Sequence, residues 1–408
     1  MPFLPWLQAS ASFLGAFEKS PSAIPTRHLA AGCQLLVRLW KRYPKPQFGL
    51  TQTLIDGNRV SASETVVLDK AFCRLLHFER ATRHSHPVIL LVAPLSGHHA
   101  TLLRDTVRAT LPDFDVYLTD WRDGRQVPLA EGAFHLDDYV AYVHEFIDYL
   151  GPDLHIVSVC QSTVPVLAAV SLMASRGEPT TVDELAVNKS LDWFEREMID
   201  TDHHLRSHLN YYFDVAAGNA EAAQMHRYFY DEYNAVLDMA AEYYLETVRV
   251  VFQECRLARG TWRVRGGRVR PGDIRDGALI TVEGEHDEIC GPGQTRAAHD
   301  LCTGIEASHK HHLTARGCGH YGIFSGTRWR TEVYPRIRAL IYGYARLPAG
   351  RKAKFVRPWR HKGEPTTRQA VNRRQGNKFC QMLSLTAISF AIRSATALEP
   401  NRNVIPVG

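Results

Sequence analysis

The sequence predicts an α/β fold, in which helices cover both faces of a mostly parallel β-sheet. Short runs rich in Val, Ile and Leu alternate with longer segments of helical periodicity, and this alternation is typical of parallel strands joined by helices. One β-branched run also ends at Cys160, and a small-residue helical pattern begins directly after it. Together, these observations predict a sheet with a functional turn at one strand end.

The elements follow from the same patterns, taken along the chain. The predicted strands cover residues 88–94, 116–121, 154–160, 278–284 and 311–316. The predicted helices cover residues 98–109, 136–150, 164–176, 219–257, 293–302 and 328–344. We expect an N-terminal helical segment at 1–60, a first part of the core at 61–176, a helical cap at 177–270, a second part of the core at 271–345 and a basic tail at 346–408.

Cys160 lies at the predicted strand-to-helix turn, in the segment Val-Cys-Gln-Ser-Thr-Val-Pro. An α/β-hydrolase holds its nucleophile at such a turn, which needs little bulk two residues to either side. Ser158 and Ser162 meet that need less well than the usual glycines. A buried cysteine at a strand end is the plainer interpretation, because free cysteine is among the most buried residue types.

Two later segments favour the functional interpretation. Asp287 follows the apolar run at 278–284, and His320 lies between glycines in Gly-Cys-Gly-His-Tyr-Gly. Each feature is common in ordinary turns. The order of nucleophile, acid and base along the chain is the one expected for an α/β-hydrolase. We therefore predict that His320 deprotonates the Cys160 thiol and that Asp287 orients the imidazole.

An acyl-transfer site also needs N–H donors for the oxyanion that forms during attack. Gln161 supplies the donor after the nucleophile, and the loop after an early strand supplies a second from Leu95 or Ser96. His98 and His99 follow after Gly97, but no carboxylate or cysteine stands beside them at metal-ligand spacing. We therefore predict no metal and no cofactor.

Longer motifs add a resemblance to a known family. They lie at residues 29–36, 92–98, 119–129, 159–165, 229–235, 282–287 and 319–329. On these segments, the chain resembles the intracellular poly(3-hydroxybutyrate) depolymerases with a cysteine nucleophile, over roughly residues 25 to 345. The resemblance implies Cys160 as nucleophile, Asp287 as acid and His320 as base. It also implies thioester chemistry on polyhydroxyalkanoate granules in the cytoplasm.

One region departs from that family. The family carries a strand containing Gly-Gly-Pro after the nucleophile helix, whereas residues 177–210 show no strand pattern. The region looks shortened, so the sequence indicates a sheet that lacks one strand and an Asp287 at risk of misplacement. Two hypotheses stay open: a working depolymerase, and a catalytically weakened homologue that binds polyester granules. A polyester synthase shares the chemistry, but the motif contexts favour a depolymerase.

The cap segment is rich in aromatic residues. They are Tyr211, Tyr212, Phe213, Tyr228, Phe229, Tyr230, Tyr233, Tyr243 and Tyr244. Helix packing is the commonest role for such residues. In the polyester hypothesis, some of them also contact an apolar polymer chain, because aromatic rings offer a large contact area.

Composition and charge agree with a cytosolic enzyme. The 408 residues include eight scattered cysteines, which indicates reduced thiols, and no uncharged run is long enough to span a bilayer. The net charge of +5 comes from the tail: residues 351–378 hold ten Lys and Arg against one Glu, and the other residues hold 38 basic against 42 acidic side chains. No nucleic-acid motif accompanies this run, so we expect no nucleic-acid partner. The sequence gives no sign of the oligomeric state.

Overall fold

The fold is that of a computed structural model. It describes residues 9–10, 24–41, 43–82, 85–151, 153–178, 182–187, 201–287 and 289–344. The basic tail therefore lies outside the described residues. Within those residues, every helix is too short or too polar to cross a membrane.

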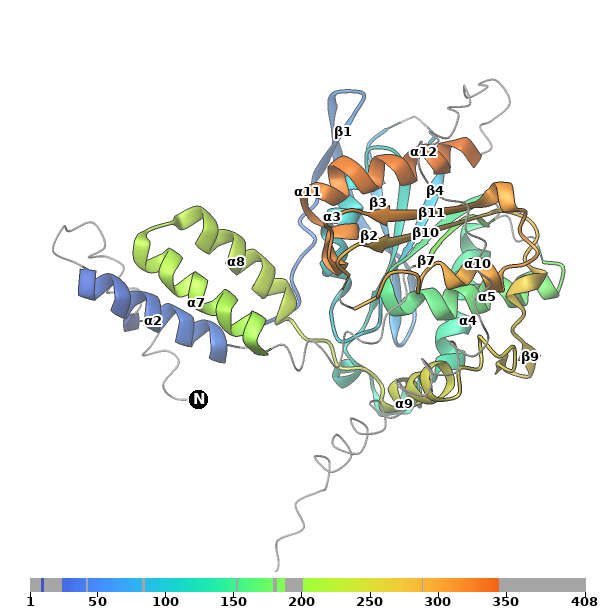
Figure 1. The fold of residues 1–408 in the computed structure, drawn as a ribbon, viewed down its shortest axis with the longest axis horizontal. Helices are drawn as coiled ribbons and strands as arrows, with labels where there is room; N and C mark the ends of the chain where they lie inside the picture. Colours follow the sequence, from blue (N-terminus) through green and yellow to red (C-terminus); the bar gives the residue numbers. More distant parts are fainter. Residues whose placement is uncertain are drawn as a thin grey trace, which may run out of the picture.

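The described strands form one large mixed sheet (Figure 1). Its nine strands run in the order β1-β2-β3-β5-β4-β6-β7-β10-β11. The first four neighbours, from β1 to β5, pair antiparallel. All pairs from β5 to β11 are parallel. Parallel strands bring their carboxyl ends to one edge of the sheet, which is where α/β proteins place their sites. The architecture is an α/β-hydrolase fold, as the sequence predicted.

Each predicted strand is present in the parallel part of the sheet. These strands are β4 (Val88–Val92), β5 (Asp115–Trp121), β6 (Leu154–Ser158), β10 (Ala278–Gly284) and β11 (Lys310–Ala315). All residues of β6 and β10 are buried, as expected for parallel strands covered on both faces. The antiparallel edge was not predicted: it comprises β1 (Gln52–Ile55), β2 (Asn58–Asp69) and β3 (Cys73–Arg80). The exposed and polar β2 explains why periodicity missed it.

The expectation of a missing strand is wrong. Strand β7 (Val182–Val187) lies between β6 and β10 and pairs in parallel with both. Its sequence, Val-Asp-Glu-Leu-Ala-Val, breaks the apolar run with two acidic residues. Pairing on both sides decides strand formation here, because β propensity depends strongly on context. The sheet is therefore continuous from the Cys160 strand to the Asp287 strand.

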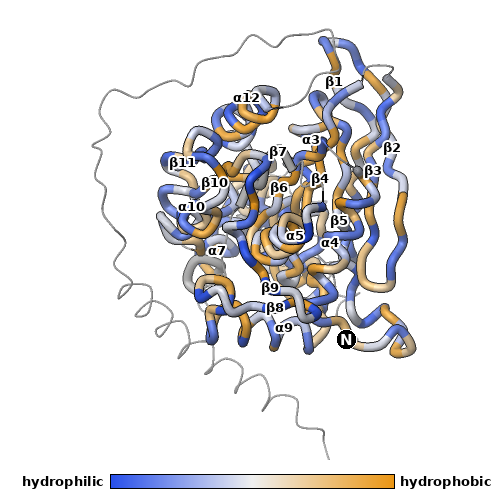
Figure 2. The backbone as a smooth tube through the Cα atoms, turned by 90° about the vertical axis from the view of Figure 1, so that its right-hand side faces the viewer, coloured by the Kyte–Doolittle hydropathy of each residue, from blue (hydrophilic) through white to orange (hydrophobic). Residues whose placement is uncertain are grey.

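Helices cover both faces of the sheet (Figure 1). On one face lie α3 (Arg104–Thr110) and α12 (Tyr334–Tyr344); on the other lie α4 (Leu136–Leu150), α5 (Thr163–Ser175) and α10 (Ala297–Leu301). Helix α5 is apolar on all sides and almost wholly buried, as expected of a helix inside a core. Hydrophobic segments gather at the centre of the sheet, around β4, β6 and α5 (Figure 2).

Three helices form a lobe beside the sheet, which we call the helical lobe (Figure 1). They are α2 (Ile24–Trp40), α7 (Thr201–Ala217) and α8 (Ala220–Tyr233). Arg38 of α2 pairs with Asp231 of α8 at 2.9 Å, and Tyr211 of α7 donates to Gln34 of α2. The N-terminal helix thus packs with the cap helices. The segment then continues through α9 (Ala241–Thr247) and the small β8 (Arg263–Val264) and β9 (Gly267–Arg268) hairpin to β10.

Candidate active site

Cys160 occupies the turn between β6 and α5 in a strained backbone conformation. Its φ is +60°, in the left-handed region that residues other than glycine adopt only at a cost. The Ser162 hydroxyl lies 2.8 Å from the carbonyl oxygens of both Val159 and Val92. Because Val92 ends the neighbouring strand β4, this hydroxyl ties the turn to the sheet. Ser162 therefore supports the tight turn, despite being bulkier than glycine.

Asp287 lies in the loop after β10, which we call the acid loop (residues 285–295). Its carboxylate is buried and accepts hydrogen bonds from two backbone N–H groups, Ile289 at 3.0 Å and Cys290 at 2.7 Å. Gly284 allows this loop to pass close to the next one, because a Cβ there would lie 2.5 Å from the carbonyl oxygen of Cys318. The carboxylate is thus held in one orientation by its own loop.

His320 follows β11 and meets both other residues. Its Nδ1 lies 3.0 Å from Oδ2 and 3.2 Å from Oδ1 of Asp287, and its side chain also hydrogen-bonds Cys160. An ionised carboxylate only accepts hydrogen bonds, so Nδ1 carries the proton and Nε2 is left to face the thiol. All three side chains are nearly inaccessible, with residue exposures of 5% for Cys160, 3% for Asp287 and 6% for His320.

The electrostatics of His320 reflect these partners. Burial alone would lower its pKa, but the hydrogen bonds to Asp287 and Cys160 outweigh burial and raise the pKa to about 10. The raised pKa means that His320 binds a proton readily, as a general base must. A Cys–His pair of this kind can abstract the thiol proton and later return it to a leaving group.

The predicted oxyanion donors lie near the same edge of the sheet. Gln161 directly follows Cys160 in the turn that opens α5. Leu95 and Ser96 are buried in the loop after β4. That loop is fixed one residue later, where the Gly97 carbonyl accepts from the N–H of Leu237 at 2.8 Å. Their role as donors stays a prediction.

His98 and His99 are buried in this loop. Burial lowers the pKa of His98 to about 4, although a hydrogen bond with the Tyr233 backbone opposes that shift. His98 is therefore neutral at pH 7. Its ring packs against Tyr233 of α8, with centroids 5.3 Å apart. Across the described residues, no group of three His, Cys, Asp or Glu side chains is arranged to hold a metal ion.

The cap aromatics divide between core and surface. Tyr211, Tyr230 and Tyr243 are buried, whereas Tyr228 is 68% exposed and Phe229 is 41% exposed. Burial raises the pKa of the Tyr243 hydroxyl, although a hydrogen bond with Thr247 opposes that shift. Packing in the core therefore explains the buried Tyr211, Tyr230 and Tyr243. It does not explain the exposed Tyr228 and Phe229.

A row of rings leads outward from His320. Tyr321 and Phe324 contact the imidazole edge-on, with centroids 5.8 Å and 5.7 Å away. Phe229 of α8 meets Tyr321 edge-on at 5.9 Å and stacks on Tyr233 at 5.6 Å. The aromatic end of the helical lobe therefore lies next to the candidate base.

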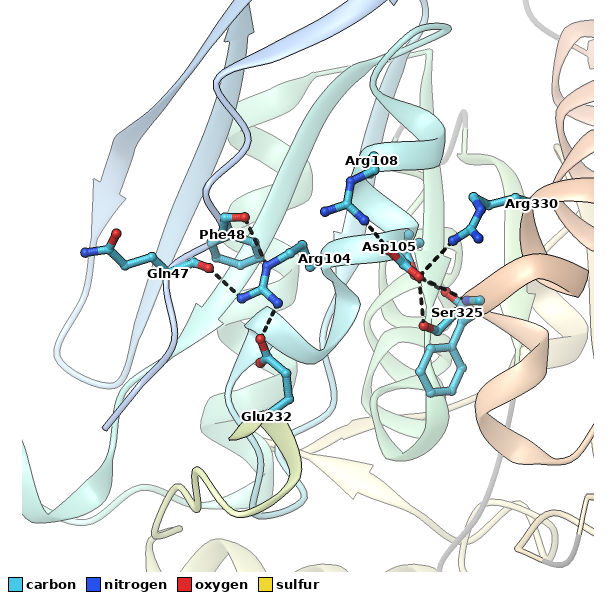
Figure 3. Close-up of polar contacts among 11 residues, drawn as sticks. Gln47, Phe48, Arg104, Asp105, Arg108, Glu232, Ser325 and Arg330 are labelled. Atoms are coloured by element: carbon cyan, nitrogen blue, oxygen red, sulfur yellow. Dashed lines mark hydrogen bonds and ion pairs between the residues drawn. The ribbon is translucent and has the colours of Figure 1, made fainter. Parts of the chain in front are cut away.

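Helix α3 links the helical lobe to the segment that follows His320, which we call the His320 loop (residues 316–330). It does so through two adjacent residues that the sequence did not predict (Figure 3). Arg104 pairs with Glu232 of α8 and donates to the Phe48 carbonyl at 3.0 Å. Asp105 accepts hydrogen bonds from Ser325 at 3.2 Å, from the Gly326 N–H at 3.1 Å and from Arg330 at 3.1 Å. An Arg-Asp dipeptide on a helix is common, so the sequence carried no signal for this link.

Comparison with known proteins adds a family match. Residues 199–345 match the family model described as PHB de-polymerase C-terminus. That range contains α7, α8, Asp287 and His320, and ends before the basic tail; Cys160 lies outside it. No curated protein sequence matches the chain.

Solved structures resemble the chain only distantly. A naproxen esterase from Bacillus subtilis is 12% identical, with 78% of this chain and 99% of that chain covered and a TM-score of 0.42. The hypothetical protein PA2218 from Pseudomonas aeruginosa is 11% identical, with 74% and 99% covered and a TM-score of 0.43. At these scores, the likenesses carry no argument about this chain. The strand order and the family match support an ester hydrolase.

Proposed function

We propose that this chain, which belongs to the PHB de-polymerase family over residues 199–345, hydrolyses the ester bonds of poly(3-hydroxybutyrate) with Cys160 as nucleophile. The observation that carries the proposal is the position of His320, which hydrogen-bonds both Asp287 and Cys160. We further propose that the enzyme acts on polyhydroxyalkanoate granules in the cytoplasm, as the family resemblance implies.

The first half of the reaction forms a thioester. Cys160 gives its proton to Nε2 of His320, and the thiolate attacks the ester carbonyl carbon. The carbonyl oxygen becomes an oxyanion, for which the N–H groups of Gln161 and of Leu95 or Ser96 are the candidate donors. As the C–O bond breaks, His320 gives its proton to the leaving 3-hydroxyl group, and the acyl chain stays on sulfur.

The second half frees the enzyme. His320 takes a proton from water, the hydroxide adds to the thioester carbonyl, and the C–S bond breaks to give a carboxylic acid and the Cys160 thiolate. The imidazolium then returns its proton to the thiolate, which restores the thiol and the neutral imidazole of the starting state. Asp287 stays ionised throughout and keeps Nδ1–H directed at itself, so that Nε2 remains available for the reaction.

The polymer reaches this site past aromatic residues. Phe229 and Tyr321 lie between the exposed face of α8 and His320, and their rings offer apolar contact to a polyester backbone with little loss of rotamer freedom. The cap aromatics thus serve as the binding surface that the polyester hypothesis requires.

One assay tests the proposal. Purified protein is incubated with amorphous poly(3-hydroxybutyrate) granules, and both released 3-hydroxybutyrate oligomers and co-sedimentation are measured. We expect release by the wild type, none by Cys160→Ala, and equal sedimentation of the two. Sedimentation with negligible release by the wild type would instead identify a granule-binding homologue. The continuous sheet through β7 removes the reason to favour that alternative.

A further inference from the structure

A chain of hydrogen bonds lies under the acid loop, outside the group of Cys160, Asp287 and His320. Glu283, buried at the end of β10, meets Nε2 of His312 through Oε1 at 3.1 Å. Nδ1 of His312 lies 2.8 Å from the hydroxyl of Thr281. The same hydroxyl lies 2.8 Å from Nε2 of His299 in α10. Four side chains from two strands and one helix are therefore connected in series.

The partners fix the direction of each hydrogen bond. A carboxylate only accepts, so Nε2–H of His312 donates to Glu283, and in the tautomer that leaves Nδ1 unprotonated, Nδ1 accepts the Thr281 hydroxyl proton. The Thr281 oxygen then accepts from Nε2–H of His299. Burial lowers the pKa of His299 to about 4, which agrees with a neutral His299 ring. Every bond in the chain runs toward Glu283.

The second oxygen of Glu283 holds the acid loop. Oε2 accepts from the Gly293 N–H at 2.8 Å and from the Thr295 hydroxyl at 2.8 Å. The beginning of the same loop donates the N–H groups of Ile289 and Cys290 to Asp287. Two carboxylates four residues apart thus fix the two ends of one short loop. Gly293, which donates to Glu283, lies three residues after Cys290, which donates to Asp287.

We propose that Glu283, His312, Thr281 and His299 form a positioning set that fixes the acid loop and, through Asp287, the orientation of His320. The hydrogen bonds of the set go to one another and to the acid loop, so we expect it to affect kcat more than KM. The inference rests on the proposed hydrolysis, because it assigns the set a role in that reaction. A misplacement of about 1 Å in a reacting group can cost about a hundredfold in rate, so a partial shift of the loop should be visible in kcat.

Substitution of Thr281 by valine tests the chain of hydrogen bonds without changing the volume of the side chain. Thr281→Val removes the hydroxyl that joins the two histidines, and Thr281→Ser keeps it. We expect Thr281→Val to lower kcat on a soluble 3-hydroxybutyrate dimer ester about tenfold with KM within twofold, and Thr281→Ser to stay within twofold in both. The matched control is Ile280→Val, a neighbouring buried residue of β10 that has no part in the chain. It should lower Tm but leave kcat unchanged.

Glu283→Gln gives a second test if Thr281→Val fails to fold. An amide cannot accept from His312, Gly293 and Thr295 at once without turning its own NH₂ group toward one of these donors, so kcat should again fall about tenfold. Equal kcat for Thr281→Val, Glu283→Gln and Ile280→Val at matched Tm would overturn the positioning role.

A spectroscopic measurement separates this proposal from the proposed hydrolysis. The Nδ1–H of His320, bonded to Asp287, should give a far-downfield proton NMR signal in Cys160→Ala protein, which needs no activity. Adding Thr281→Val should shift or broaden that signal, whereas Ile280→Val should not. An unchanged signal overturns the positioning role even if the enzyme is active, and a wild type inactive on every ester overturns the hydrolysis alone.

Discussion

The acid loop and the helical lobe differ in whether their buried polar groups have hydrogen-bond partners. Around the acid loop, both oxygens of Glu283 at the end of β10 and the Asp287 carboxylate have partners, and most of these partners are backbone N–H groups or hydroxyls. In the lobe, both ring nitrogens of His226 are buried without a hydrogen-bond partner. That ring is held by stacking on Tyr211 and Tyr230, with centroids 4.5 Å and 4.3 Å away.

The surfaces of the two regions differ as well. The lobe exposes large apolar side chains on all three helices: Leu29, Trp40, Leu205, Phe213, Met225 and Tyr228 are each more than half exposed. In the acid loop, by contrast, the Asp287 carboxylate is buried. Directional hydrogen bonds fix geometry, whereas ring packing and exposed apolar area supply contact without a single orientation. Substitutions in the acid loop should therefore change turnover, and substitutions in the lobe should change polymer binding.

The largest expected effect is on Asp287. Asp287→Asn should lower kcat about 10³- to 10⁴-fold, because an amide no longer fixes the tautomer of His320. Granule co-sedimentation should stay at the wild-type level, since the lobe is untouched. The matched control is His286→Ala, an exposed neighbour, which should stay within twofold. Equal damage from His286→Ala would contradict a specific role for the Asp287 carboxylate.

Gly284→Ala tests the close approach of the two loops. The new Cβ would lie 2.5 Å from the Cys318 carbonyl oxygen, so the His320 loop must move. We expect a loss of about 1 to 3 kcal/mol in the free energy of unfolding in urea, together with a lower kcat. Gly343→Ala in α12 is the control, since no atom lies within 4 Å of its Cβ position. A neutral Gly284→Ala would show that the loops are not in tight contact.

Phe229→Ala tests the lobe side of the comparison. The Phe229 ring is 41% exposed, so we expect it to contact the polymer directly, and one aromatic contact contributes about 0.5 to 1.5 kcal/mol. Polymer affinity should therefore fall about two- to tenfold, with kcat on a soluble dimer ester unchanged. Leu129→Ala removes an exposed apolar side chain elsewhere and should leave both values unchanged. A fall in soluble-ester turnover alone would count against a polymer-binding role.

The last prediction concerns the pH dependence of stability. The pKa of His320 rises from an ordinary 6.5 to about 10 on folding, so the folded state holds this proton more tightly than the unfolded chain. Its contribution to stability is complete below pH 6.5 and is lost as the pH rises through about 10. The difference in Tm between wild type and His320→Gln should therefore shrink between pH 7 and pH 10. A constant difference would contradict the raised pKa.

Local sequence patterns predicted the parallel strands. Those strands place Cys160, Asp287 and His320 at one edge of the sheet. Their catalytic roles stay predictions. Strand β7 escaped prediction because Asp183 and Glu184 mask its apolar pattern, and its neighbours in the sheet lie far away in the sequence. The contact between α2 and α7 and the hydrogen bonds of Glu283 were not predicted, for a related reason. Both join side chains that lie more than ten residues apart in the sequence.

The expected domain boundaries stay predictions too. The boundary at residue 60 falls inside β2, and residues 52–69 form a hairpin in place of a helix end. The basic run at 351–378 and its lone Trp359 lie outside the described residues.

The left-handed backbone of Cys160 makes this position one where selection for stability and selection for activity oppose each other. A residue with a Cβ at φ +60° costs about 1 to 3 kcal/mol, a penalty that glycine largely avoids. Directed evolution for heat resistance alone would therefore enrich glycine at position 160 and discard the thiol. Thermal tolerance among variants of this chain is thus a poor guide to their activity, and libraries should be screened for ester cleavage first.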